Sequence, residues 1–100
     1  MYKAIILPQA KEDVREAALW YNRRQKGLGK RFTAELTERI QLIRQNPSVY
    51  AIRYEDVRTA VLNIFPFMIH YTLNEAEKTI IIVGVFHTSL SPDRWNRDRE

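Results

Sequence analysis

The sequence contains no cysteine, which excludes disulfide bonds and metal sites built from thiolates. Glycine and proline are also scarce, with three and four residues, and we find no internal repeat, linker or low-complexity segment. No apolar run approaches the roughly 20 residues that a membrane-spanning helix needs. The first residues, Met1 to Ala4, lack the apolar core of a secretion signal. We therefore expect a cytoplasmic protein that does not associate with membranes.

The length of 100 residues predicts a single domain, residues 1–100, with one hydrophobic core. Hydrophobic residues make up 45% of the chain, which is an ordinary share for a folded protein. The net charge is +4, and most of the positive charge is arginine, which favours carboxylate and phosphate partners. The charge therefore fits an acidic partner, either nucleic acid or an acidic protein segment, and it equally fits a mildly basic surface with no specific partner.

The segment from Val57 to His87 predicts three consecutive strands, around which we expect the rest of the chain to be organised. The first runs over about 57–65. The second covers 67–73, where side chains alternate with the period of two that marks a strand. A polar turn at 74–78 leads into the third strand, at 79–86. Short connections of this kind join antiparallel neighbours.

Two helices are expected upstream of these strands. A short strand at 2–7 precedes a helix that opens at Pro8 and breaks at Gly27-Leu28-Gly29. A second helix, at 30–45, has apolar residues at helical spacing and stops at Asn46-Pro47. The short break between them predicts an antiparallel helical hairpin. With a further short strand at about 51–54, this order favours an α+β fold with the helices on one face of the sheet.

The expected third strand is apolar on both faces, with Ile80 and Ile82 on one side and Ile81, Val83 and Val85 on the other. A strand of this kind is normally covered on both sides. The helical hairpin covers only one side, so the second face needs the C-terminal segment with Trp95, a second copy of the chain or a partner peptide. We take this uncovered face as the main indication of a binding function.

Residues that could carry chemistry are few. The sequence has no phosphate-binding loop and no metal-ligand spacing, so we expect neither a metal nor a cofactor. His70 sits in mid-strand, where a structural role is favoured. His87 ends the third strand at a rim, where it could be a general acid or base or could simply hydrogen-bond the strand end. Arg58 begins a strand among apolar neighbours and needs carboxylates or backbone carbonyls as partners.

The C-terminal segment mixes arginine with an aromatic residue. Arg94, Trp95 and Arg97 could bind a target through charge and stacking. Asp93 and Asp98 are interleaved with them, and a local salt-bridged turn with Trp95 packed on the sheet is the alternative. A second basic cluster surrounds the break between the helices, where it is either a binding patch or a solvated face: Arg23, Arg24, Lys26, Lys30 and Arg31.

An ordered set of these residues resembles the RelE/ParE toxin superfamily, and most of all its ParE-like plasmid stabilisation branch. The set is Arg58, Phe65-Pro66-Phe67, Ile69, Tyr71, His87, Pro92, Trp95 and Arg97, with Ala10, Asp13, Tyr21, Phe32 and Asn46-Pro47 upstream. The resemblance covers nearly the whole chain. It implies an α+β fold with an N-terminal strand, an antiparallel helical hairpin packed on one face of a twisted antiparallel sheet, and a short C-terminal helical turn.

The resemblance also implies a function. Such a protein would be the growth-inhibiting toxin of a type II toxin–antitoxin pair, neutralised by a cognate antitoxin, and present as a homodimer or a toxin–antitoxin hetero-oligomer. The ParE-like branch poisons DNA gyrase without a catalytic step, whereas the RelE-like branch cuts messenger RNA on the ribosome. Met68 and Thr88 stand where RelE-like toxins tend to carry catalytic arginines, which favours gyrase.

Two alternatives stay open at this point. One is a ribosome-dependent mRNA endonuclease in which His87, Arg58 and the tail arginines handle protons and phosphate. The other is a non-toxic homologue that keeps only the ability to bind. Leu90 is one departure from the ParE-like pattern, because that branch usually carries an arginine between the histidine and the proline.

Overall fold

The computed structural model describes residues 1–95. Two long helices and five strands follow one another in the order that the sequence predicts, with one short 3-10 turn after the second helix and another in the C-terminal segment. The elements are β1 (Lys3–Ile6), α1 (Pro8–Arg24), α2 (Leu28–Gln45), η1 (Pro47–Val49), β2 (Ile52–Tyr54), β3 (Val57–Val61), β4 (Phe67–Asn74), β5 (Thr79–His87) and η2 (Pro92–Arg94). Within residues 1–95, neither helix is long and apolar enough to cross a membrane.

The five strands form one sheet in the order β1-β5-β4-β3-β2. The pairs β2–β3, β3–β4 and β4–β5 are antiparallel, as expected, whereas β1 pairs with β5 in parallel. The sheet is therefore mixed rather than antiparallel throughout. No tight turn joins β1 to β5, since both helices and three strands separate them in the chain, so hairpin geometry does not set their relative direction.

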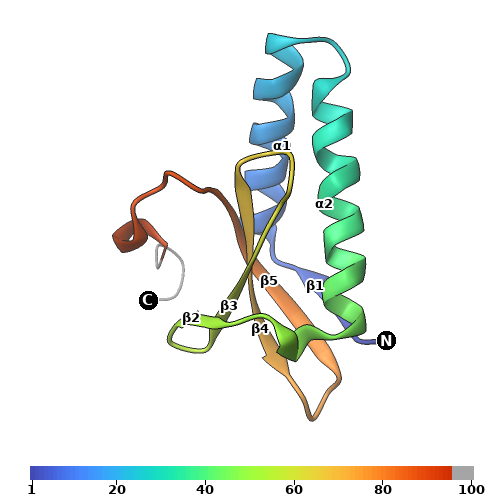
Figure 1. Ribbon diagram of the computed structural model, residues 1–100, viewed down its shortest axis with the longest axis vertical. Coiled ribbons are helices and arrows are strands. Elements are labelled where there is room, and N and C mark those ends of the chain that lie inside the picture. The colour runs from blue at the N-terminus through green and yellow to red at the C-terminus, as the bar shows by residue number, and fades with distance from the viewer. Residues whose placement is uncertain (96–100) are drawn as a thin grey trace.

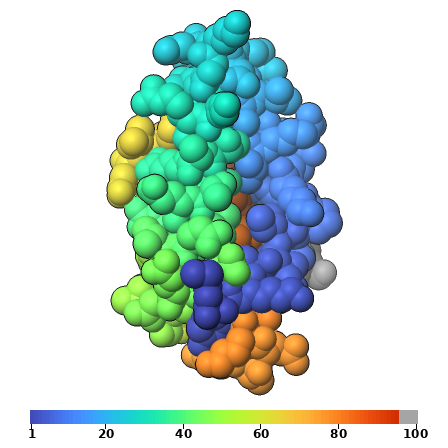
Figure 2. Space-filling model, turned by 90° about the vertical axis from the view of Figure 1, so that its right-hand side faces the viewer, coloured from blue at the N-terminus to red at the C-terminus, as the bar shows by residue number. Residues whose placement is uncertain are grey.

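The two helices cover one face of the sheet and form the main core with it (Figures 1 and 2). Each helix turns an apolar stripe inward, because its buried residues recur at helical spacing. The buried residues of this core include Ala17, Tyr21, Phe32, Leu36, Ile40, Ile69, Tyr71, Ile80 and Ile82. The α+β fold with a helical hairpin on one face is confirmed.

Glycine shapes the hairpin at two positions. The break is Gln25-Lys26-Gly27, slightly earlier than expected, and Gly27 has a φ of 86°, which favours glycine. Gly29 lies inside α2, where a Cβ atom would stand 2.3 Å from the carbonyl oxygen of Ala18. Its backbone N–H instead donates to the side chain of Asn22 at 2.8 Å. The second glycine therefore allows the helices to approach closely rather than ending a helix.

A bulge in β5 changes which residues face the helices. His70 pairs with Gly84, but the next residue of β4 pairs with Ile82, which leaves Val83 as the extra residue. The alternation shifts by one position at this point. Val85 consequently joins the core beside the helices, and its expected placement with Ile81 and Val83 is wrong.

The opposite face of the sheet carries a second, smaller cluster. Met68, Phe86 and Trp95 are its buried residues, with Tyr54 and Leu90 packed against them. The chain passes over this face after β5, on the side away from the helices (Figure 1). The C-terminal segment is thus one of the three covers considered for this face. As far as residue 95, this segment covers only part of the face, and Ile5 at the β1 edge is 40% exposed.

Candidate functional site

A groove of about 350 Å³ opens between α1 and the end of β5. Its walls are mainly apolar and come from both elements and from the loop that follows β5. Three polar side chains, Asp13, Glu16 and His87, also line it. The apolar lining includes Ala17, Trp20, Tyr21, Phe67, Val85 and Leu90.

The groove exists because β5 is longer than its neighbour β1. The parallel pairing ends where Leu7 donates its N–H to the carbonyl of Ile82 at 3.1 Å. Beyond this point β5 continues to His87, and its edge faces α1 instead of a strand. The backbone N–H of Val85 donates to the Asp13 carboxylate at 3.0 Å, so a side chain of α1 meets part of that edge.

His87 stands at the rim of this groove, where the sequence places it. Its exposed ring packs edge-on to Phe67, with the ring centres 5.2 Å apart. Its Nδ1 accepts the backbone N–H of Ser89 at 3.0 Å and lies 2.7 Å from the Ser89 hydroxyl. The imidazole therefore holds the loop after β5, which is the hydrogen-bonding role considered for a strand-end histidine.

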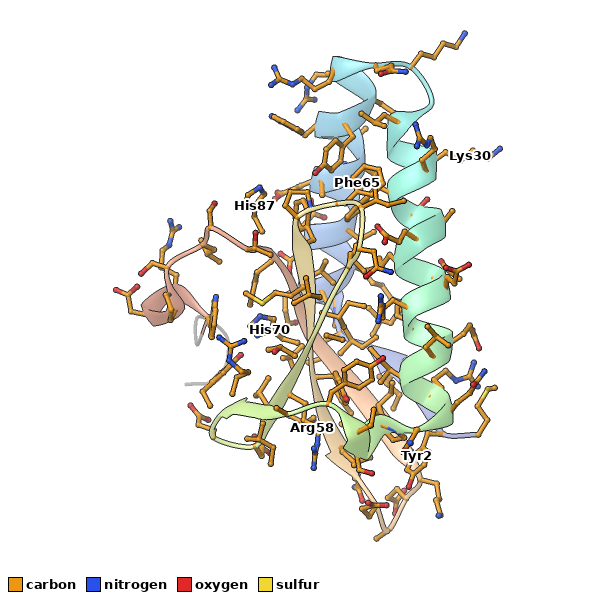
Figure 3. The ribbon with its side chains drawn as sticks, viewed as in Figure 1. Tyr2, Lys30, Arg58, Phe65, His70 and His87 are labelled. Carbon is orange, nitrogen blue, oxygen red and sulfur yellow. The ribbon has the colours of Figure 1, made fainter. Side chains whose placement is uncertain are left out.

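Arg58 lies in the other half of the sheet. Its guanidinium donates to the backbone carbonyls of Ser48 at 3.2 Å and Tyr50 at 2.6 Å, so it ties η1 to the sheet. Along β4, Arg58 pairs with Tyr71 in the middle of the strand, whereas His87 pairs with Phe67 at its start. Figure 3 shows the two side chains far apart. The fold does not bring these two catalytic candidates into one site.

The tail candidates separate as well. Trp95 is 8% exposed and packs against His70 and Tyr54, with ring centres 4.8 and 5.4 Å apart. Arg94 is exposed. Arg97 lies outside the described residues, as does most of the helical turn expected at 94–99. Of the three residues suggested for target binding, only Arg94 is described as available to a partner.

His70 is the centre of the second cluster. Its ring is fully buried, Nδ1 lies 3.0 Å from the Tyr54 hydroxyl, and Phe86 packs against it. Burial lowers the pKa of His70 from its usual 6.5 to about 4, with a further contribution from the charge of Arg53. The structural role expected for this histidine fits these contacts. Within residues 1–95, no group of three acidic, histidine or cysteine side chains is placed to hold a metal ion.

Sequence reasoning missed Trp20, which lines the groove and is 47% exposed. It lies outside the apolar stripe of α1, so a search for core residues passes over it. The available signal was a tryptophan at a helical position that periodicity assigns to solvent, with Arg24 four residues later. In the structure the Arg24 guanidinium carbon lies 4.6 Å from the centre of the Trp20 ring.

Several solved structures share this fold. A chain of the chromosomal ParDE system from P. aeruginosa superposes with a TM-score of 0.78 at 17% identity, covering 89% of this chain and 98% of that one. The isolated E. coli RelE toxin gives 0.69 at 13% identity, covering 99% and 97%. A chain of the intact E. coli RelBE complex gives 0.67 at 13% identity, covering 87% and 96%.

No curated protein matches the chain in sequence. A family profile does match, over residues 4–91, and its description is the ParE toxin of the type II toxin–antitoxin system parDE. The match spans the helices, the five strands and the loop after β5. The chain therefore belongs to the ParE toxin family of type II toxin–antitoxin systems.

Proposed function

We propose that this chain is the toxin of a type II toxin–antitoxin pair, that it arrests growth by binding DNA gyrase, and that a cognate antitoxin neutralises it. In this proposal it works in the cytoplasm as a single domain of residues 1–100. Family membership and the likeness to chains from the ParDE and RelBE systems support the toxin role. The observation that carries the antitoxin part is the apolar groove beside the exposed end of β5.

The groove suits a segment that folds as it binds. It offers about 350 Å³ lined largely by aromatic and aliphatic side chains, with Trp20 47% exposed at its side. A disordered segment with apolar side chains gains most of its binding energy by burying them on such a surface. Occupying the groove would also cover His87 and the end of β5, which line it.

Action by binding, rather than by RNA cleavage, is favoured by the placement of the two catalytic candidates. Cleavage of a phosphodiester needs a proton-transfer group and cations around the same phosphate. His87 pairs with the first residue of β4, Phe67, whereas Arg58 pairs with Tyr71 in the middle of that strand, and backbone carbonyls engage the guanidinium of Arg58. These residues do not converge on one phosphate, and this favours gyrase over messenger RNA as the target.

The target is tested by comparing two reactions with the same purified chain. We expect inhibition of DNA supercoiling by gyrase and an undiminished yield of in vitro translation. Induced expression without the antitoxin should arrest growth, and His87→Ala should still arrest it. Loss of translation with cut messages would overturn the gyrase proposal, and full growth at strong expression would overturn the toxin role itself.

The groove is tested with two leucine variants and the protein encoded by the adjoining reading frame as the antitoxin. Leu90→Asp places a charge in the groove, so we expect the affinity for the antitoxin to fall at least about tenfold. Leu42→Asp is the matched control, because Leu42 is 46% exposed on α2 and does not line the groove. Equal affinities for the two variants would place the antitoxin elsewhere.

A further inference from the structure

We infer that the tip of the helical hairpin binds single-stranded nucleic acid, with cationic side chains on the phosphates and Trp20 stacked on a base. This site adjoins the groove that we propose for the antitoxin, and Trp20 belongs to both, whereas the basic residues of the tip do not line the groove. Figure 3 shows the side chain of Lys30 extending outward near the tip. Five exposed basic residues flank the break between the helices: Arg23, Arg24, Lys26, Lys30 and Arg31.

The charge of this patch is concentrated and uncompensated along the chain. No acidic residue occurs between Glu16 and Glu35, whereas the five cations occupy the centre of that interval. The whole chain has a net charge of +4, so the tip alone carries more positive charge than the protein has in excess. A local field of this strength attracts polyanions and is screened by salt.

The demands of the fold do not account for the patch. Arg23 and Arg24 end α1, where positive charge complements the helix dipole. Lys30 and Arg31, however, lie in the first turns of α2, where positive charge opposes the dipole, and that first turn contains no acidic residue. This second pair costs the fold stability, so a bound anion is the better explanation for its presence.

Trp20 directs the choice of polyanion. Its ring is 47% exposed, it stands edge-on to the Tyr21 ring at 5.1 Å, and the Arg24 guanidinium lies over it at 4.6 Å. Bases stack on exposed aromatic rings and on guanidinium planes, so an unpaired base can extend this stack. A duplex keeps its bases inside the helix, so a single strand is the nucleic acid that can offer a base to the indole.

Binding is tested on the full chain by fluorescence anisotropy with labelled oligo(dT) and oligo(U) of about 12 nucleotides, a length within the usual footprint of single-strand binding. Each phosphate neutralised on a single strand contributes about −0.7 to the slope of log affinity against log salt concentration. Five phosphate contacts therefore predict a slope of about −3.5. Comparing the two oligonucleotides shows whether DNA or RNA is preferred.

Two pairs of variants separate this patch from charge in general. Arg23→Glu with Arg24→Glu changes the net charge by the same amount as Lys3→Glu with Lys11→Glu, which are exposed positions away from the tip. We expect the tip pair to lose at least about tenfold in affinity and to make the salt slope shallower by about 1.4, whereas the control pair stays within about threefold. Equal losses would overturn the proposal.

Stacking is tested separately. Trp20→Ala should weaken single-strand binding about tenfold, and Leu42→Ala, an exposed apolar control, should leave it unchanged. If Trp20→Ala has no effect, or if poly-glutamate displaces the oligonucleotide as well as unlabelled oligo(dT) does, the site is a general anion patch and the proposal fails. Growth arrest is a separate measurement, so this failure would leave the toxin role standing.

Discussion

At the scale of single residues, the fold keeps one histidine neutral at pH values where a solvated imidazole would take up a proton. The His70 ring is enclosed by Phe86 and Trp95, and the hydroxyl of Tyr54 is the hydrogen-bond partner of Nδ1. Its Nε2 has no hydrogen-bond partner among the described residues. A charged imidazole would lose its hydration here and would be repelled by Arg53, so the neutral form is selected.

This selection makes stability depend on pH. The pKa of His70 is about 4 in the fold and ordinarily 6.5. Between pH 4 and pH 6.5, His70 is therefore protonated in the unfolded chain and neutral in the folded chain. The contribution of His70 is complete above about pH 6.5 and is lost as the pH falls toward 4. We expect the free energy of unfolding to drop by about 1 kcal/mol between about pH 7 and 5.5, measured by urea denaturation.

Replacing the histidine isolates its share of that dependence. His70→Gln removes the titrating ring, so the decline between about pH 7 and 5.5 should become shallower by nearly the amount above. His87→Gln removes an exposed histidine from the groove and serves as the matched control. A His70→Gln protein that declines as steeply as the parent would show that other groups set the pH dependence.

At the scale of elements, a carboxylate of α2 holds the loop between β3 and β4. Glu35 accepts backbone N–H groups from Asn63 at 2.7 Å, Ile64 at 3.0 Å and Phe65 at 3.2 Å. The loop is thereby fixed against the helix, and the Phe65 ring packs on Tyr21 with centres 4.9 Å apart. Burial raises the pKa of Glu35, but the three donors outweigh it and the net pKa is lowered.

We expect Glu35→Gln to lower the free energy of unfolding by about 1–2 kcal/mol at about pH 7, because an amide accepts these N–H groups less strongly than a carboxylate does. The carboxylate with a lowered pKa stabilises the fold above its ordinary range and loses that contribution as the pH falls through its folded pKa. The difference between variant and parent should therefore shrink in acid. Glu38→Gln, exposed on the same helix, is the control. An equal loss of stability in this control would refute the role of Glu35 in holding the loop.

The sequence predicts the elements well and their long-range contacts poorly, for a physical reason. Helix and strand periodicity is local, so the hairpin and all five strands could be placed within a few residues. The sequence around Glu35 predicts only a surface ion pair with Arg39. It does not predict the contact with a loop 28 residues away. The bulge at Val83 likewise depends on pairing with β4, so alternation alone misplaces Val85.

In the candidate site, too, local features could be predicted from the sequence and long-range contacts could not. His87 was placed at a rim because it ends a strand, and a strand end is a local property. The groove itself depends on β1 stopping at Ile6 while β5 continues, which no single segment reveals. Trp20 was missed for that reason, and Arg58 was grouped with His87 only because the register between strands was not known.

At the scale of the whole molecule, different segments of the chain cover the two faces of the sheet. Two helices cover one face, and a short C-terminal segment covers part of the other, where Trp95 is buried. The tail was first considered as a target-binding element. In the structure its tryptophan belongs to a packed cluster, and this leads to an opposite expectation for mutation of that residue.

Trp95→Ala should lower the free energy of unfolding by about 3 kcal/mol, because it removes a buried ring from Met68, Phe86 and His70 and leaves a cavity. Trp95→Phe should recover most of that loss, since it keeps an aromatic ring and discards an indole N–H that has no hydrogen-bond partner within residues 1–95. Arg94→Ala, at an exposed neighbour, should stay within about 0.5 kcal/mol of the parent. If Trp95→Ala instead keeps full stability and loses only target binding, the residue acts at the surface and the second face of the sheet does not depend on the tail.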